Sequence, residues 1–441
     1  MTTSKKIGIG CACALVCCCG GSYSLLQGLF GSAASKRDAE VAAARKAGIP
    51  VDPAGLSAML NVPDDRNAAP IYRQAMKLEE GDEHYDKDLK TIRDGLAKKA
   101  TVAQRQAMAE ALGRVGPLQK MVEKAGDMPS CDFHHDWSLG AKLLFPEFAH
   151  MKSWGRLLCA DAELRSERGD WRGALKQIER SERIAHHSGQ DPILIGMLVG
   201  VATEAITVAA LQRVIEDHRD NPAFVSEALK TVKQFGSLPD FRRAMMGELV
   251  LGRASIRGLN GSADLQMTGE PHAEPNRWEK AFFQSPQVQG AFDAKLVEAY
   301  RKMIEALPKD PSQWEKSYQV AVERGRAVEA DHSIANTLNQ IIMPVFEQAA
   351  QSVGQALMRR RLAITTLKLL DEKAHKRAFP RLLPNFGDDR IDPFSGKPLH
   401  YLREDSGFLL YSVGKDRVDD GGAGRDPKDS SKTFDESIHI K

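Results

Sequence analysis

Apolar side chains recur at the spacing of an α-helix through most of the chain that follows residue 35. Aromatic residues make up only 6% of the chain while alanine and leucine are frequent, which favours helix over sheet. The last long segment, 334–376, has a start or a kink at Pro344. It carries one apolar stripe whose members are three, four or seven residues apart: Val353, Leu357, Ile364, Leu367 and Ala374. We therefore expect a mainly α protein, built as an irregular helical array.

Helix start and stop signals divide the rest of the chain into further predicted helices. Thr101 and Gln104 form a capping-box pattern, Pro146 predicts a bend, and Pro311 suits the first position of a helix. The predicted ranges are 36–47, 67–80, 101–112, 139–168, 193–215, 222–235, 239–259, 288–307 and 311–331, and one more helix opens at residue 169. Range 193–215 is apolar enough for a membrane span, but Glu204 in its middle favours a buried central helix.

An uninterrupted apolar run extends from Ile7 to Phe30 and follows Lys5 and Lys6. A helix of this length crosses the hydrocarbon core of a bilayer. We predict that residues 1–34 are a signal anchor, with the membrane as a partner of residues 7–30. Cleavage near the small residues 32–34 and lipid attachment at Cys18 are the two alternatives. Lys5 and Lys6 favour a cytoplasmic N-terminus, but the basic residues 36, 37, 45 and 46 follow the span closely. The C-terminal resemblance described below favours export, so we expect the body outside the cytoplasm.

Two short alternating segments, Leu399–Leu402 and Phe408–Val413, predict a β-hairpin joined by a polar turn at residues 405–407. An isolated hairpin is only marginally stable in water, so its apolar face needs a cover. The apolar stripe of the preceding long helix is the expected cover. The predicted organisation is a signal anchor at 1–34, a helical body at 35–333, a helix-plus-hairpin unit at 334–422 and a flexible tail at 423–441.

The segment DPFSGKPLHYL, from Asp392, and LLYSVGKDRVDDGG, ending at Gly422, resemble the C-terminal end of the major pseudopilins of type II secretion. The resemblance implies a long helix followed by a small antiparallel sheet and a last loop that binds calcium. Carboxylates with glycines between them supply the oxygen ligands that calcium prefers. The calcium ligands that the resemblance implies are Asp416, Asp419, Asp420, Asp426 and Asp429. The N-terminus lacks the Gly-Phe cleavage site of true pseudopilins.

Two further resemblances lie nearer the N-terminus. Residues 62–76, VPDDRNAAPIYRQAM, contain an N-A-A-x-x-Y signature that is similar to one in many uncharacterised exported bacterial proteins. Several of those proteins end in the same D-P-F-S-G-K-P segment. Residues 157–192 resemble one tetratricopeptide (TPR) unit, which implies two antiparallel helices. No second copy follows at the same period, so we expect a TPR-like array with irregular repeats.

Charge and motif content exclude several classes of function. A net charge of +2 argues against nucleic acid as a partner, and the chain lacks a P-loop, a G-x-S-x-G elbow and a G-x-G-x-x-G turn. The region of His134, His135 and Asp136 is the candidate for a metal site. Convergence of Cys131, His134 and His187 on one point would favour a metalloenzyme. Cys131 and Cys159 form either a disulfide or two buried thiols.

We predict a single-pass protein of the bacterial inner membrane, with its body outside the cytoplasm. Its expected role is non-catalytic interaction or assembly with envelope proteins, and no cofactor beyond the calcium of the last loop is predicted. An exported metal-dependent hydrolase using residues 134–136 is one alternative. An accessory subunit of a type II secretion or pilus-like apparatus is the other.

Overall fold

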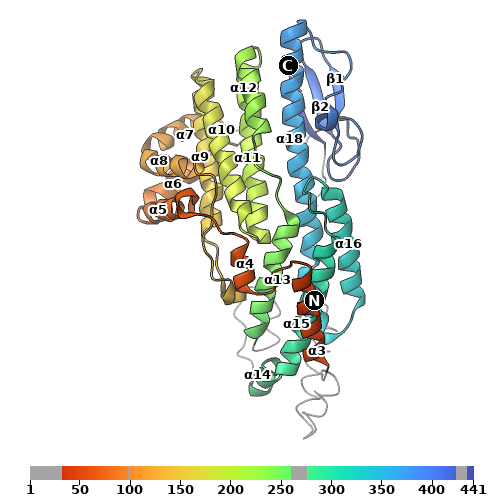
Figure 1. Cartoon of the computed structure of the whole chain (residues 1–441). Coiled ribbons are helices and arrows are strands. Elements are labelled where there is room, and N and C mark those ends of the chain that lie inside the picture. The colour runs from red at the N-terminus through yellow and green to blue at the C-terminus, as the bar shows by residue number, and fades with distance from the viewer. Residues whose placement is uncertain (1–31, 98–99, 260–275, 424–434) are drawn as a thin grey trace.

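The computed structural model describes residues 32–97, 100–259, 276–423 and 435–441. Within these residues the chain is mainly helical, as predicted, and carries one small antiparallel sheet of three strands. Long helices lie roughly side by side, and the sheet lies beside one end of the last of them (Figure 1). The predicted membrane segment at 7–30 lies outside the described residues.

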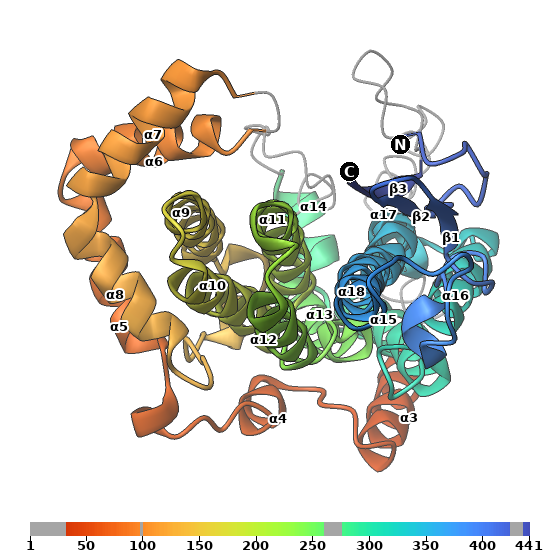
Figure 2. The same ribbon diagram turned by 90° about the horizontal axis from the view of Figure 1, so that it is seen from above.

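An outer layer of short helices covers one flank of the molecule. Figure 2 shows α5 to α8 as an arc outside the central helices. The predicted capping box is confirmed: the Gln104 amide donates to Thr101 Oγ1 (3.2 Å) and the Thr101 amide donates to Gln104 Oε1 (2.8 Å). Two helices of this arc, α6 and α8, were not predicted from the sequence. The elements of this part are α4 (Pro53–Ala58), η1 (Asp64–Arg66), α5 (Ala69–Glu80), α6 (Glu83–Gly95), α7 (Val102–Arg114) and α8 (Gly116–Gly126).

The central helices follow the predicted pattern with one difference. The helix predicted from residue 139 begins only at Glu147, because Pro146 supplies no amide hydrogen bond to a preceding turn. Gly140 also leaves helical geometry at φ 56°, so residues 137–142 form a separate 3₁₀ segment. These elements are η2 (Trp137–Lys142), α9 (Glu147–Glu167), α10 (Trp171–Gln190), α11 (Leu194–His218), α12 (Pro222–Lys233) and α13 (Phe241–Arg257).

Helix α11 is the one helix of the described residues that is long and apolar enough to cross a membrane, and 61% of its most apolar window is buried in the protein. Glu204, at its middle, is 3% exposed and accepts a hydrogen bond from Arg360 Nη2 of α18 (Pro344–Lys376) at 2.9 Å. A buried carboxylate needs such a partner. Burial and this ion pair agree with the predicted central core helix.

The C-terminal half surrounds one long helix. The predicted segment from residue 334 is broken into a 3₁₀ turn, α17 and a new helix that starts at Pro344. The helix predicted from Pro311 begins instead at Trp314, since residues 311–312 form a turn. Helix α3 packs on α15, where Arg301 Nε lies 2.8 Å from Glu40 Oε2. The elements are α3 (Ala33–Lys46), α14 (Arg277–Phe283), α15 (Pro286–Ala306), α16 (Trp314–Ala330), η4 (Ile334–Asn336), α17 (Thr337–Ile342), α18 (Pro344–Lys376) and η5 (Gly387–Arg390).

The sheet confirms the predicted hairpin and corrects the predicted tail. Strands β1 (His400–Arg403) and β2 (Phe408–Ser412) pair antiparallel, and the apolar face of β2 packs into the core that includes α18. Residues 436–440, predicted to be flexible, form β3 (Glu436–Ile440), antiparallel to β2. The prediction missed an alternation that buries Ile438 and Ile440, 5% and 1% exposed, beside the hairpin.

Asp392, the first residue of the D-P-F-S-G-K-P segment, holds this segment against the end of β2. Its side chain is fully buried. One carboxylate oxygen accepts from the Phe394 amide (2.9 Å) and Ser412 Oγ (2.8 Å). The other accepts from Ser395 Oγ (3.1 Å) and the Val413 amide (3.2 Å). The carboxylate thus ties the turn before β1 to the end of β2, and we call it the Asp392 clasp.

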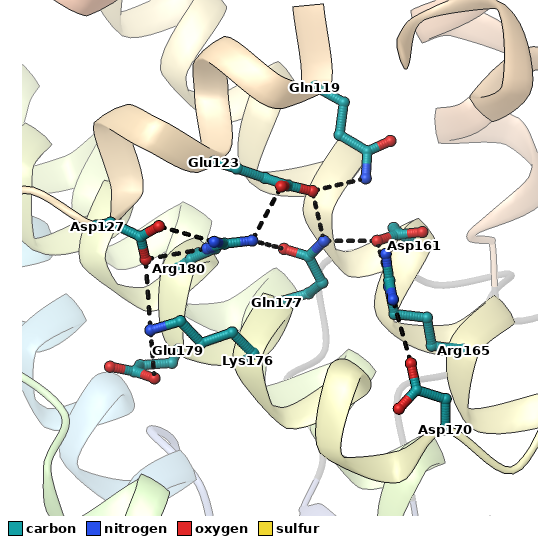
Figure 3. A network of polar contacts seen from close by, with 10 residues as sticks. All are labelled: Gln119, Glu123, Asp127, Asp161, Arg165, Asp170, Lys176, Gln177, Glu179 and Arg180. Carbon is teal, nitrogen blue, oxygen red and sulfur yellow. Dashed lines mark hydrogen bonds and ion pairs between the residues drawn. The ribbon is translucent and has the colours of Figure 1, made fainter.

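A polar network fastens the outer layer to the central helices (Figure 3). Arg180 of α10 pairs with Asp127 (2.7 Å) and Glu123 (3.0 Å) at the end of α8. The Gln177 side chain donates two hydrogen bonds through its Nε2, to Glu123 of α8 (2.7 Å) and to Asp161 of α9 (2.6 Å). Every charged group that the figure draws has a partner, so we assign this network a structural role.

Candidate metal centre

Three acidic or basic side chains from separate segments meet in the interior below the outer layer. His135 Nε2 lies 3.2 Å from Glu147 Oε1 and 3.3 Å from Asp191 Oδ2. The three side chains are 9%, 6% and 2% exposed, respectively. This His135–Glu147–Asp191 cluster is the one group of three potential metal ligands whose ligand atoms converge, within 4.8 Å, in the described part of the chain.

Two prolines place the carboxylates. Helix α10 ends at Gln190 because the residue before a proline is disfavoured in helical geometry, and Asp191, which precedes Pro192, is extended at φ −64°, ψ 127°. Glu147 follows Pro146 at the first position of α9, where a negative charge suits the helix N-terminus. The cluster therefore uses the end of one helix and the start of another.

The N-A-A-x-x-Y signature supports the segments that carry the ligands. Asn67 Nδ2 donates to the Asp132 carbonyl (2.9 Å), and Asn67 Oδ1 accepts from the Asp132 amide (2.9 Å), three residues before His135. Tyr72, which is fully buried, bonds His187 Nδ1 through its hydroxyl (2.9 Å), four residues before Asp191. The signature thus fixes both the loop and the helix that supply ligands.

Helix α13 holds the Asp191 segment from the other side. A Cβ atom on Gly247 would lie 1.5 Å from the Pro192 carbonyl oxygen, so only glycine allows this close approach. The next residue, Glu248, accepts a hydrogen bond from the Leu194 amide (3.0 Å) at the start of α11. Burial raises the pKa of Glu248 to about 7. The chain around Asp191 is therefore fixed on both sides.

Aromatic rings surround the His135 imidazole. Its centroid lies 5.8, 5.3 and 4.9 Å from those of Phe133, Trp137 and Phe145. Such a wall excludes water and strengthens electrostatic interactions inside it.

The charges of the cluster have no adequate hydrogen bonds of their own. His135 Nε2, Glu147 Oε1 and both Asp191 oxygens are buried and lack a hydrogen-bond partner of good geometry. Burial lowers the pKa of His135, but the carboxylates of Asp191 and Glu147 outweigh it and raise that pKa to about 9. Burial raises the pKa of Asp191, against the opposing effect of His135. One N–H cannot point at two oxygens at once, so a proton satisfies this arrangement poorly.

A divalent metal ion would satisfy the buried polar atoms of this cluster better than a proton does. In a tetrahedral zinc site with bonds of about 2.0–2.1 Å, neighbouring ligand atoms lie about 3.3 Å apart. The separations of His135 Nε2 from the two carboxylate oxygens, 3.2 and 3.3 Å, match that edge, and the two carboxylate oxygens lie within 4.8 Å of each other. One imidazole and two carboxylates also carry the charge and donor atoms that zinc, manganese and ferrous ions accept.

The structure places the histidines and cysteines named in the sequence analysis differently. His134 has positive φ (51°) and a 57% exposed side chain beside Asp132, and so turns away from its neighbour His135. His187 uses both ring nitrogens, on Tyr72 and on the Met128 carbonyl, so it has none left for a metal. Cys131 and Cys159 are both buried free thiols, so they form no disulfide. Residues 134, 187 and 131 therefore do not form the centre.

The predicted calcium loop is described in part. Asp416 Oδ1 accepts from the Val418 amide (3.2 Å), and Asp419 Oδ1 accepts from the Tyr411 hydroxyl (3.1 Å) and the Gly421 amide (3.0 Å). The Asp420 amide donates to Asp435 Oδ2 (3.0 Å). The other two predicted ligands, residues 426 and 429, lie outside the described residues, and calcium binding stays a prediction.

Comparison with protein-family models, with curated proteins and with solved structures finds no match to this chain. Its own fold and site therefore define its class: a mainly α-helical protein with a small antiparallel sheet and a buried histidine–dicarboxylate cluster. The signal that pointed to the cluster was the histidine pair at 134–135. Glu147 and Asp191 gave no such signal, because neither has a sequence neighbour in the cluster.

Proposed function

We propose that this is a membrane-anchored, extracytoplasmic helical protein that binds a divalent transition-metal ion through His135, Glu147 and Asp191. Its role is interaction or assembly in the bacterial envelope rather than catalysis. The observation that carries the proposal is the pair of carboxylate oxygens facing one imidazole nitrogen at 3.2 and 3.3 Å without good hydrogen bonds. Buried charges of this kind are paired or coordinate metals.

The position of the cluster supports a structural role for the metal. The three ligands belong to the loop after α8, to the start of α9 and to the end of α10. A metal ion would tie the outer layer to the central helices at this point, and its binding energy would add to folding stability. The ligand side chains are at most 9% exposed, which leaves little access for a substrate.

The envelope assignment rests on the apolar run at 7–30 and on the resemblance of the C-terminal segment to the pseudopilins. Two features of the fold support the resemblances. Helix α18, followed by a small antiparallel sheet, is the arrangement expected of a pseudopilin-like unit, and the antiparallel pair α9 and α10 is the arrangement expected of a TPR-like unit. Helix faces would provide the contact surface, and an accessory role in a secretion or pilus-like apparatus is one form of this function.

A metal-dependent hydrolase is the second candidate, favoured by the number of ligands. Catalytic zinc sites keep three protein ligands and an open fourth position, and the cluster offers three. Ester hydrolysis by the zinc-loaded chain that is lost in Asp191→Asn would establish this candidate. Metal binding without any hydrolysis supports the structural role.

Cobalt(II) titration tests the metal site directly, because tetrahedral cobalt absorbs strongly in the visible region. We expect a visible band that saturates at one equivalent in the full chain, in detergent. His135→Gln abolishes the band. His134→Gln is the matched control, since its imidazole is a neighbour in sequence but faces solvent. Loss of the band in both variants, or in neither, contradicts the assignment of ligands.

Protease access in spheroplasts tests the location. We expect external protease to digest residues beyond 34 in intact spheroplasts. Protection of the body until the membrane is dissolved would contradict the extracytoplasmic location and leave the metal site unaffected.

A further inference from the structure

A second polar site lies between the central helices and α18. Residues of α10, α11, α13, α18 and the segment before α13 enclose a cavity of about 210 Å³. Small residues, Ala185, Gly189 and Gly200, line it where α10 and α11 pack closely: a Cβ on Gly200 would lie 2.7 Å from the Ala185 carbonyl oxygen. The lining also includes residues 237–239 and the charged or polar side chains of Glu182, His186, Gln190, Glu204, Asp240, Arg243 and Arg360.

Most charges of this cavity are already neutralised within the protein. Arg360 Nη2 bonds Glu204 Oε2 (2.9 Å), and Arg360 Nη2 lies 3.8 Å from Glu182 Oε1. Glu182 Oε1 accepts from the Gly236 amide (2.8 Å). Asp240 caps α13 by accepting from the Arg243 amide (2.9 Å). These contacts fix the carboxylates in place.

Arg243 differs from Arg360. It is a lining residue of the cavity, its Nε is buried without a hydrogen-bond partner, and no carboxylate of the described residues lies within ion-pair distance of it. A guanidinium that is partly removed from water and unpaired favours an anion, and its planar fork matches a carboxylate.

We propose that this cavity binds a small organic carboxylate, whose anionic group pairs with Arg243. The size of the cavity supports the ligand class, since sites for drug-sized molecules are roughly 300–1,000 Å³ and this one is smaller. Burial raises the pKa of Glu182 to about 7 and lowers that of His186 to about 4. Near neutral pH His186 is therefore neutral and Glu182 is about half ionised, and both side chains can hydrogen-bond the polar body of the ligand.

Succinate is the probe for the test, titrated into the full chain in detergent and followed by calorimetry. We expect binding by the wild-type chain and an affinity at least about tenfold weaker in Arg243→Met, because a charge-assisted hydrogen bond is lost. Arg242→Met is the matched control: Arg242 Nε donates to the Ile304 carbonyl (3.1 Å), outside the cavity. Its affinity for succinate should equal that of the wild type.

Protection of Arg243 from phenylglyoxal by succinate, read by mass spectrometry on the wild-type chain, keeps the test valid if the variant does not fold. No binding of succinate at 10 mM overturns the proposal, as does equal binding by Arg243→Met. Binding of inorganic phosphate but not of succinate overturns the carboxylate assignment. The metal titration above uses other residues, so the two proposals fail independently.

Discussion

Two buried aspartates, each followed by proline, have opposite surroundings in this protein. Asp392 is fully buried, and its carboxylate accepts four hydrogen bonds from the turn around it and from β2. Asp191 is 2% exposed, and neither of its oxygens accepts a hydrogen bond of good geometry. Its nearest cationic partner is His135, which it shares with Glu147.

The number of hydrogen bonds distinguishes a structural carboxylate, Asp392, from a carboxylate that is available to a ligand, Asp191. Burying a carboxylate costs free energy that hydrogen bonds must offset. The Asp392 clasp meets that condition with protein donors alone. The His135–Glu147–Asp191 cluster does not, and a metal ion is the partner that satisfies all three side chains together.

The largest expected effect is that of Asp392→Ala. Removing the carboxylate leaves two buried amides and two hydroxyls without their acceptor, and each unsatisfied buried donor costs about 1–3 kcal/mol. We expect the free energy of unfolding, measured by urea denaturation, to fall by about 4 kcal/mol or more. Asp405→Ala, in the exposed turn between β1 and β2, is the control and should change it by less than about 0.5 kcal/mol. Similar values for the two variants would contradict the structural role of the clasp.

Gly247→Ala should have the next largest effect. Its added Cβ collides with the Pro192 carbonyl oxygen beside Asp191, and overpacking costs about 1–3 kcal/mol. We also expect weaker cobalt binding, because Asp191 is displaced. Gly113→Ala, where a Cβ meets nothing within 4 Å, should stabilise α7 slightly and leave the metal affinity unchanged. Unchanged stability and metal affinity in Gly247→Ala would show that α13 does not position Asp191.

Acid should destabilise the protein through His187. Burial lowers its pKa to about 3, below the value of about 6.5 for an exposed histidine. Between those values the unfolded chain binds a proton that the folded chain does not, so stability falls as pH drops. We expect His187 to contribute a loss of about 2 kcal/mol between pH 7 and pH 5.

His187→Gln removes that contribution, so the difference in free energy of unfolding between wild type and variant should narrow as the pH drops from 7 to 5. Urea denaturation at each pH measures it. His84→Gln is the control, because the His84 side chain is 88% exposed. A difference that stays constant with pH would mean that His187 is not held neutral.

The smallest expected effect on stability is that of Asp191→Asn in the metal-free chain. The substitution removes a buried charge that is costly to desolvate, and Glu147 remains as the counter-ion of His135. We therefore expect a change of less than about 1 kcal/mol in the free energy of unfolding, well below the loss of about 3–5 kcal/mol that is typical when a buried charge is left without any partner. Urea denaturation in chelator measures it. A loss as large as that of Asp392→Ala would show that Asp191 has a structural partner already.

The sequence predicted the features that depend on neighbouring residues. The capping box at Thr101, the start of α10 after Asp170 and the hairpin are set by local turn chemistry and periodicity. The third strand was missed because a five-residue alternation near the C-terminus is too short to stand out from a polar tail. The outer helices α6 and α8 were missed as well.

The metal centre could be predicted only as a region. His135 belongs to the histidine pair at 134–135, but its partners are 12 and 56 residues away and converge through the packing of α9 and α10. The N-A-A-x-x-Y signature is visible in the sequence, but its physical role depends on contacts that only the fold shows, those of Asn67 with Asp132 and of Tyr72 with His187.

The most direct test of the metal centre is the metal content of the full chain purified from cells without chelator, measured by inductively coupled plasma mass spectrometry. We predict close to one equivalent of a divalent transition metal in the wild-type chain and in His134→Gln, and its loss in His135→Gln and Asp191→Asn. The assignment of the metal centre would be contradicted by a wild-type chain that holds no metal and also fails to take up zinc or cobalt. Undiminished metal in Asp191→Asn would contradict it as well.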